Sequence, residues 1–306
     1  MFPFSSVWSG LNSRKRKNLP TAKKARASVA AGDCYIFGSA EGISEKLEIK
    51  EEDLVIFCDG GLKYADRVQK KKCFLFGDLD SCEEEMLRGL CEAYEKSRTE
   101  NPANKTDNSD GEKGCRPKET EVIQNYFECL KNDTDSELEY AGKKLTVRLF
   151  PVRKDDTDTA LALKFALKKN CKRFFLYGCC GGDRPDHFFA NLALLSLAAE
   201  HGKQAFLYDG RYCYTMIGNG AGSAETVIEG SAGKRYSCFA YGGNVTGLRL
   251  SGFEYETEDI TLLKDVSLGA GNTIKSDRAG ISIRTGQLLI VSETEPVSFL
   301  SETKKG

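Results

Sequence analysis

Between residues 33 and 209, short runs of apolar, β-forming residues alternate with loops and with helix-compatible stretches. The runs at 34–37 and 54–57 are bounded by Gly or Asp, as buried parallel strands commonly are. The same pattern predicts further strands at 73–76, 145–151, 173–177 and 205–208. It predicts helices that start at 62, cover 157–169 and cover 186–201. Strand, loop and helix in alternation indicate an α/β domain with a mostly parallel, doubly wound sheet over residues 33–212.

After about residue 212 the pattern changes to short segments separated by glycines. We expect strands at 225–228, 236–240, 247–250, 280–283 and 288–291. No convincing helical pattern occurs among them. The sequence therefore predicts an all-β second domain over 213–300, an antiparallel sandwich or barrel.

Two segments fall outside this rhythm. Residues 95–121 contain no large aliphatic or aromatic side chain, and 13 of the 27 residues are charged. Such a segment buries too little surface to offset its ordering entropy, which predicts a mobile polar insertion flanked by helical segments. Residues 1–32 carry seven Lys or Arg and no acid, which is typical of a disordered arm; a targeting signal or a mis-assigned start is the alternative.

Composition narrows the class of protein. The 306 residues are 40% hydrophobic and 29% charged with a net charge of −1, so a globular protein without a nucleic-acid footprint is expected. No apolar run is long enough to span a membrane. The 12 cysteines are scattered, without a C-x-x-C pair, and the N-terminus has no secretory apolar core. Reduced thiols and a cytoplasmic location follow as predictions.

Candidate chemistry lies where the predicted strands end. Asp78 and Asp80 directly follow the run at 73–76, and an extended backbone there would place both carboxylates on one side, where they could share Mg²⁺. Ser81 could add a hydroxyl ligand or cap the next segment. A surface turn is the alternative interpretation of this short motif.

A second acidic group opens the helix predicted at 157–169. Asp155, Asp156 and Asp158 are three carboxylates within four residues. Aspartate can cap a helix start, but capping does not require three neighbouring negative charges. A bound cation would offset their repulsion, so a metal or a bound polycation is favoured over capping.

Two glycine-containing loops could bind a phosphate group. Residues 59–61 read Asp-Gly-Gly between a predicted strand and helix, where glycines allow close approach to the backbone. The loop at 178–187 is rich in glycine and ends in Arg184, Asp186 and His187; Arg184 offers a forked phosphate donor. A tight turn, or a histidine that is merely hydrogen-bonded, explains either loop equally well in isolation.

Taken in order, the four motifs resemble the thiamine pyrophosphokinase family. Its D-G-G, G-D-x-D-S, K-D-x-T-D and G-R-x-D-H patterns correspond here to residues 59–61, 77–81, 154–158 and, with a longer glycine loop, 184–187. The resemblance implies transfer of pyrophosphate from ATP to the hydroxyl of thiamine, with Mg²⁺ as cofactor and AMP released. It also implies a homodimer whose site is shared between subunits.

The resemblance assigns roles residue by residue. It implies Mg²⁺ ligands at Asp78, Asp80 and Asp158. The implied catalytic residues are Asp59, Asp158 and Arg184, with either aspartate as proton acceptor. The remaining implied nucleotide and substrate contacts are Gly60, Gly61, Ser81, Asp155, Asp186, His187 and Asn272.

One departure leaves alternatives open. The family's Ser-Asn pair for thiamine appears here as Gly271-Asn272. A non-catalytic nucleotide or thiamine sensor that kept the fold is therefore the alternative to an enzyme. An aspartyl-phosphate phosphatase, suggested by residues 78–80, leaves the β-rich domain without a role, and nucleic-acid binding by the basic arm would show as strong salt dependence.

Overall fold

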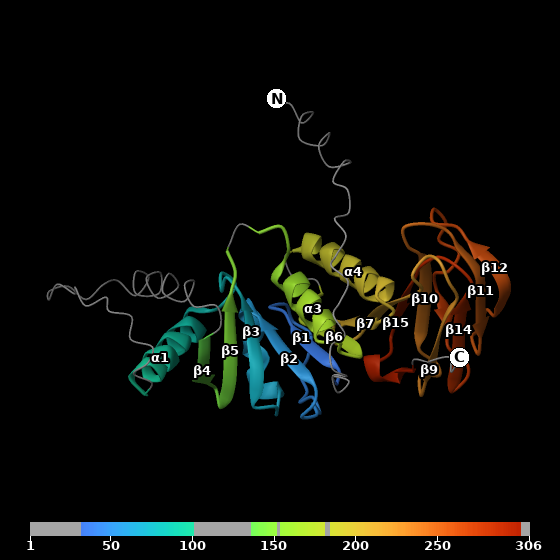
Figure 1. The fold of residues 1–306 in the computed structure, drawn as a ribbon. Coiled ribbons are helices and arrows are strands. Elements are labelled where there is room, and N and C mark those ends of the chain that lie inside the picture. Colours follow the sequence, from blue (N-terminus) through green and yellow to red (C-terminus); the bar gives the residue numbers. More distant parts are fainter. Residues whose placement is uncertain (1–31, 101–135, 152–153, 181–183, 301–306) are drawn as a thin grey trace, which may run out of the picture.

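Two β-sheets organise the chain, and helices cover the larger one (Figure 1). The structure is a computed structural model that describes residues 32–100, 136–151, 154–180 and 184–300. All but the last residue of the basic arm predicted at 1–32 lies outside these described residues, as does most of the polar insertion, residues 101–121. Within them, no helix is long and apolar enough to cross a membrane.

The larger sheet has 11 strands in the described part of the chain, in the order β13-β10-β15-β8-β7-β6-β1-β2-β3-β5-β4. Its strands are β1 (Cys34–Phe37), β2 (Leu54–Cys58), β3 (Lys72–Gly77), β4 (Ser136–Tyr140), β5 (Lys143–Leu149), β6 (Arg173–Tyr177), β7 (Gln204–Tyr208), β8 (Cys213–Ile217), β10 (Arg235–Ala240), β13 (Asn272–Thr273) and β15 (Leu288–Ser292). The central strands from β7 to β5 pair in parallel, and the strands at both edges pair antiparallel.

The chain order of the parallel strands reverses at β1. From β1 the chain adds β2, β3 and β5 on one side, then β6 and β7 on the other. In open α/β sheets, ligands bind beyond the carboxyl ends of the strands near such a reversal. All four sequence motifs follow the carboxyl ends of β2, β3, β5 and β6.

Both faces of the parallel strands are buried, because alternate side chains of a strand point to opposite faces. In β1, Ile36 packs in one apolar cluster with residues of α3 (Asp158–Lys168) and α4 (Pro185–Glu200). Its neighbour Phe37 packs in the other cluster with residues of η2 (Asp59–Arg67), a 3₁₀ helix, and α1 (Glu84–Glu100). Ile36 and Phe37 are both fully buried, and each such side chain stabilises the fold by roughly 1.5–3 kcal/mol.

The second sheet is wholly antiparallel and has five strands in the order β12-β11-β14-β9-β16. Its members are β9 (Ala224–Glu229), β11 (Val245–Ser251), β12 (Thr257–Leu262), β14 (Arg278–Ile283) and β16 (Phe299–Leu300), the last preceded by the short η4 (Pro296–Ser298). Phe299 packs on Phe206 of β7, with ring centroids 5.4 Å apart, and so connects the second sheet to the first.

The predicted combination of an α/β part with an all-β part is confirmed. The C-terminal strands, however, divide between the two sheets: β8, β10, β13 and β15 extend the larger sheet. The domain boundary expected between residues 212 and 213 lies between β7 and β8, which are hydrogen-bonded neighbours in the same sheet. The expected polar insertion begins later than residue 95, because α1 continues to Glu100.

Some elements could not be predicted correctly from the hydrophobic pattern of the sequence. In β4 only Leu138 is buried, because this strand forms an edge of the sheet and its other side chains are polar or partly exposed. The helix expected to start at 62 is the 3₁₀ helix η2, which begins three residues earlier at Asp59. Asp59 is therefore part of an ordered element that follows β2 directly.

Candidate active site

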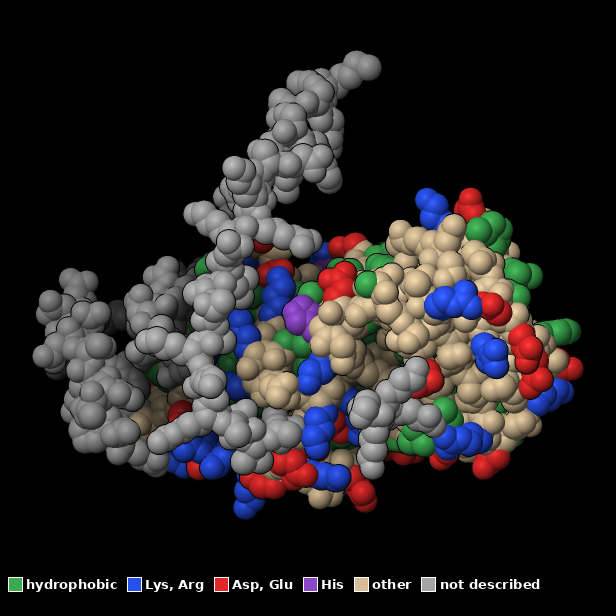
Figure 2. Space-filling model, turned by 45° about the vertical axis from the view of Figure 1, so that its right-hand side comes forward, with side chains coloured by type: hydrophobic (Ala, Val, Ile, Leu, Met, Phe, Trp, Pro, Cys, Tyr) green, Lys and Arg blue, Asp and Glu red, His purple; other side chains and the backbone are tan. Residues whose placement is uncertain are grey.

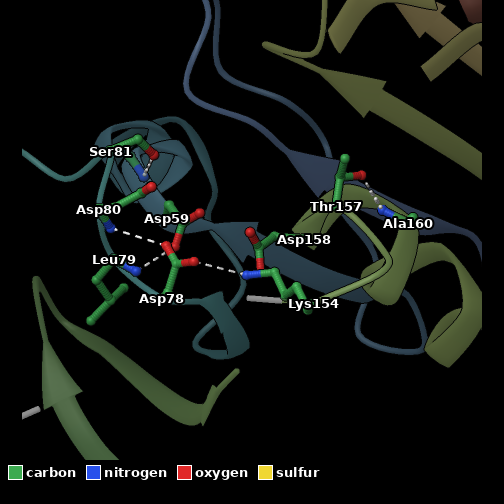
Figure 3. A network of polar contacts seen from close by, with 10 residues as sticks. Asp59, Asp78, Leu79, Asp80, Ser81, Lys154, Thr157, Asp158 and Ala160 are labelled. Atoms are coloured by element: carbon green, nitrogen blue, oxygen red, sulfur yellow. Dashed lines mark hydrogen bonds and ion pairs between the residues drawn. The ribbon is translucent and has the colours of Figure 1, made fainter. Parts of the chain in front are cut away.

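Three carboxylates from separate segments of the chain converge at the carboxyl edge of the larger sheet (Figure 3). Asp59, Asp78 and Asp158 each place a ligand oxygen within 4.8 Å of the others. They follow β2, follow β3 and begin α3, respectively. Parallel strands end at the same edge, which is why residues so far apart in sequence meet here.

Asp59 is fixed by its backbone and by its neighbours. It has a positive φ of 46°, and its residue is only 7% exposed. The Leu79 amide donates a hydrogen bond of 2.7 Å to Asp59 Oδ1. The carboxylate lies against Gly77, where a Cβ would come within 1.7 Å of Oδ1, so only glycine fits there. The second motif therefore begins with glycine for a packing reason that involves the first motif.

The segment 78–80 is not extended, contrary to the sequence expectation. Leu79 has a φ of 66°, which turns the chain between the two aspartates. The Asp80 amide donates to Asp78 Oδ1 at 3.3 Å, as in an Asx turn. Asp80 is exposed and lies outside the group of three close carboxylates, and Ser81 is exposed with its Oγ accepting from the Gly60 amide at 3.3 Å.

Asp158 is held in the first turn of α3. The helix is capped by Thr157, whose Oγ1 accepts from the Ala160 amide at 3.2 Å, and neither Asp155 nor Asp156 serves as the cap. Asp156 instead pairs with Lys164 at 2.6 Å, and Asp155 is exposed. The helix dipole favours a carboxylate such as Asp158 at this end.

Lys154 connects two of the carboxylates, although its sequence motif gave it no separate role. Its ammonium lies 3.0 Å from Asp78 Oδ2 and 2.8 Å from Asp158 Oδ1. The spacing of four residues between Lys154 and Asp158 was the available sequence signal, since oppositely charged residues four apart often pair. Here Lys154 lies before α3, and Asp158 is the first residue of that helix.

The carboxylates titrate unequally because they are crowded and partly buried. Burial, reinforced by the charges of Asp158, Asp78 and Asp80, raises the pKa of Asp59 to about 8. Burial also acts to raise the pKa of Asp78, but hydrogen bonds from Lys154 and the Asp80 amide outweigh it and hold that pKa below its ordinary value. Burial and the charge of Asp78 raise the pKa of Asp80.

The donor set fits a hard divalent cation. Carboxylate oxygens are the ligands that Mg²⁺ prefers, together with water and phosphate oxygens. Asp158 Oδ1 is buried and, apart from its ion pair with Lys154, has no hydrogen-bond donor among the described residues. A buried carboxylate oxygen is costly unless a cation neutralises it, and in the metal-free protein the Lys154 ammonium is that cation.

The fourth motif presents exposed charges. Arg184 Nε and Nη2 donate to the two carboxylate oxygens of Asp186 at 3.0 and 2.7 Å. This pairing lowers the pKa of Asp186 to about 2 and raises that of Arg184, to which the charge of Asp80 contributes further. His187 is exposed at the start of α4, and residues 181–183 of the glycine-rich loop lie outside the described chain.

Gly60 and Gly61 are buried, and the structure gives each a packing role. A Cβ on Gly61 would lie 2.0 Å from the Phe37 carbonyl oxygen, and one on Gly60 would lie 2.4 Å from that of Ser81. Asn272 is also engaged: its Oδ1 accepts from the Tyr255 and Thr273 amides, and its Nδ2 donates to the Tyr255 carbonyl. Gly271, at φ 78°, has open space where a side chain would project.

A separate crevice of about 1020 Å³ lies away from these residues. It opens at the amino ends of β6 and β7 and along the second sheet, with Arg173, Gln204 and Arg249 in its lining. Its lining mixes acids and bases, and two of its arginines are already paired, Arg173 with Asp33 and Arg284 with Asp259. Basic and acidic side chains are likewise interspersed on the face shown in Figure 2. The carboxylate edge is therefore the stronger candidate for the active site.

Comparisons with known proteins agree with the motifs. Residues 127–207 match the family model described as thiamin pyrophosphokinase, catalytic domain, a stretch that includes Asp158 and Arg184. A thiamine pyrophosphokinase of Bacillus subtilis (strain 168) is 28% identical over 170 residues, which are 55% of this chain and 76% of that protein. The resemblance to this family is confirmed, and such enzymes are thiamine diphosphokinases.

Solved structures share the fold. The crystal structure of thiamine pyrophosphokinase from Bacillus subtilis is 20% identical with a TM-score of 0.57, over 86% of this chain and 100% of that one. The enzyme from Geobacillus thermodenitrificans is 19% identical with a TM-score of 0.55, over 87% of this chain and 99% of that one. The fold likeness therefore extends well beyond the stretch that the family model matches.

Proposed function

We propose that this protein is a thiamine pyrophosphokinase, which transfers the pyrophosphoryl group of ATP to the hydroxyl of thiamine and releases AMP. The observation that carries the proposal is the meeting of Asp59, Asp78 and Asp158 at the carboxyl edge of the sheet. Each comes from a different motif of the resemblance, and residues 127–207, which include Asp158, match the model of that catalytic domain.

Phosphoryl transfer depends mainly on positioning and on neutralising negative charge. In the proposal, Asp78, Asp80 and Asp158 hold Mg²⁺, which when bound neutralises phosphate charge. Asp80 is exposed beside Asp78, so solvent can reach its carboxylate. Arg184 would supply a further positive charge once its pair with Asp186 opens toward a phosphate.

A proton must leave the thiamine hydroxyl as it attacks the β-phosphorus. Asp59 and Asp158 are the proposed acceptors. The raised pKa of Asp59, about 8, means that this carboxyl binds a proton more firmly than an ordinary aspartate, and it accepts the thiamine proton only from its ionised form. The proposed contacts to nucleotide and thiamine remain Gly60, Gly61, Ser81, Asp155, Asp186, His187 and Asn272.

The proposal extends to assembly and location. Residues 33–212 would bind the nucleotide and residues 213–300 the thiamine, with two copies of the chain sharing each site. Light scattering or sedimentation would test the homodimer. The proposed location is the cytoplasm, where cysteines stay reduced; the ten cysteines of the described chain are free thiols.

The deciding experiment incubates the full chain with ATP, Mg²⁺ and thiamine, and follows AMP and thiamine pyrophosphate. Both products should appear in equal amounts and only when thiamine and Mg²⁺ are present. Reactions without thiamine, or with a chelator, are the controls. Absence of AMP, or AMP release that ignores thiamine, would refute the proposal; tight thiamine binding without turnover would instead identify a sensor.

A further inference from the structure

Lys154 pairs with two of the three close carboxylates, Asp78 and Asp158. Its Nζ lies 3.0 Å from Asp78 Oδ2 and 2.8 Å from Asp158 Oδ1. Figure 3 shows these three side chains together. The three side chains are mostly buried, with exposures of 14% for Lys154, 7% for Asp78 and 16% for Asp158. Ion pairs that are this buried are screened far less by salt than pairs on the surface.

The ammonium offsets a strong local excess of negative charge. Carboxylate oxygens of Asp59, Asp78 and Asp158 lie within 4.8 Å of one another. Among the described residues, Lys154 forms ion pairs with two of them, Asp78 and Asp158. Like charges at such distances repel unless a cation lies between them. Lys154 therefore joins the loop after β3 to the start of α3.

A divalent cation would need oxygen atoms of the same carboxylates. Inner-sphere Mg²⁺ lies about 2.0–2.1 Å from its ligand oxygens, and an ammonium already paired with Asp78 and Asp158 interferes there by charge and by space. Asp158 Oδ1 illustrates the conflict, because its partner in the described chain is the Lys154 ammonium.

We propose that Lys154 is an internal counter-ion: it holds Asp78 and Asp158 together in the metal-free protein and competes with the divalent cation for both carboxylates. This inference rests on the metal assignment of the proposed function and adds a positioning residue to it. Cation binding then requires the ammonium to move off at least one carboxylate, which weakens binding of the metal alone.

The test measures Mn²⁺ binding to the full-length protein by electron paramagnetic resonance, without nucleotide or thiamine. Lys154→Gln removes the charge but keeps a hydrogen-bond donor, and it should bind Mn²⁺ at least about fivefold more tightly than wild type. Lys154→Arg keeps the charge and should bind Mn²⁺ like wild type.

Lys164→Gln is the matched control. Lys164 also pairs with an aspartate, Asp156, at 2.6 Å, and it lies on α3 outside the carboxylate group. Its loss removes the same unit charge from a position close to Lys154 in the sequence, so any general electrostatic effect appears in this variant too. Only Lys154→Gln should show the larger gain in Mn²⁺ affinity.

Thermal unfolding gives a second measurement. Without metal, Lys154→Gln should unfold at a lower temperature than Lys154→Arg, and saturating Mn²⁺ should remove the difference. Mn²⁺ affinity of Lys154→Gln equal to or weaker than that of wild type overturns the counter-ion proposal alone. If no variant binds Mn²⁺, the metal assignment of the proposed function fails and the counter-ion proposal fails with it.

Discussion

The carboxylate group around Lys154 and the Arg184 loop belong to the same proposed site, yet they are built in opposite ways. Asp59, Asp78 and Asp158 are mostly buried, and short contacts to Leu79 and Lys154 fix them. Arg184 and Asp186 are each 63% exposed as side chains and pair chiefly with one another. One region is organised before any ligand arrives, and the other keeps its charges in solvent.

This difference follows from the electrostatic repulsion within each region. Neighbouring carboxylates repel, so the fold must hold them with hydrogen bonds, an internal cation and glycines that permit close packing. An arginine that neutralises a phosphate needs no such restraint, because the exposed pair with Asp186 costs little to open. Substitutions in the first region should therefore affect stability and metal binding, whereas those in the second should affect nucleotide affinity alone.

Asp80 provides the largest expected effect, because it is a proposed metal ligand that lies at the surface. It neighbours Asp78 but is exposed, so Asp80→Asn should reduce turnover by at least about 100-fold through the loss of a metal ligand. The melting temperature should change by no more than about 1 °C, since surface substitutions cost little stability. AMP formation and thermal unfolding measure the two quantities.

Glu85→Gln, a change of one carboxylate in the first turn of α1, is the control for loss of negative charge near this loop. It should retain wild-type turnover. If Asp80→Asn is fully active, the metal ligands are confined to the three close carboxylates, and the assignment of Asp80 is wrong.

Asp59 should determine how stability depends on pH in the metal-free protein. An unfolded Asp titrates near ~4, whereas the folded carboxyl has a pKa of about 8. The folded state therefore holds a proton that the unfolded state releases, and stability falls as the pH rises through the interval between these values. Asn keeps the acceptor for the Leu79 amide and tolerates positive φ, so Asp59→Asn should remove this loss.

At pH 8 the Asp59→Asn variant should melt roughly 2 °C or more above wild type, and the two should converge as the pH approaches ~4. Thermal unfolding in chelator across this range measures the effect. Asp66→Asn, on the same 3₁₀ helix but exposed, should follow the wild-type curve. Parallel curves for wild type and Asp59→Asn would show that Asp59 is ionised in the folded protein.

The sequence predicted where the carboxylates lie along the chain but not how they meet. Strand ends could be located from apolar runs, and parallel pairing brought residues 59, 78 and 158 to one edge. The turn at Leu79 could not be foreseen, because a left-handed conformation at leucine depends on the contact of its amide with Asp59. The roles of Gly60 and Gly61 were hidden for the same reason: their neighbours Ser81 and Phe37 are distant in sequence.

The fold, like the site, could be predicted from the sequence only in part. Buried strands such as β6 have a continuous apolar signal, and the prediction at 173–177 is confirmed. The edge strand β4 and the exposed strand β12 have mostly polar sequences, so local pattern alone could not identify them. That β8 joins the larger sheet depends on hydrogen bonding to β7, which the hydrophobic pattern does not specify.

Arg184 tests the solvent-exposed side of the comparison, with the smallest expected effect. Arg184→Met removes the guanidinium and should raise the KM for ATP about tenfold, since a charge-assisted contact to phosphate contributes roughly 1.5–3 kcal/mol. The melting temperature should stay within about 1 °C of wild type, because an exposed ion pair contributes little to folding. Steady-state kinetics with varied ATP and thermal unfolding measure these quantities.

Arg211→Met separates a role in phosphate binding from a general loss of surface charge. Arg211 is 70% exposed and pairs with Glu293 at 3.0 Å, an arrangement similar to that of Arg184 and Asp186 but outside the four motifs. Its removal should leave the KM for ATP unchanged. An unchanged KM for ATP in Arg184→Met would show that Arg184 does not bind the phosphate. A clear fall in its melting temperature would show that the pair with Asp186 stabilises the fold. Either result would remove the contrast between a preorganised carboxylate group and a ligand-dependent arginine.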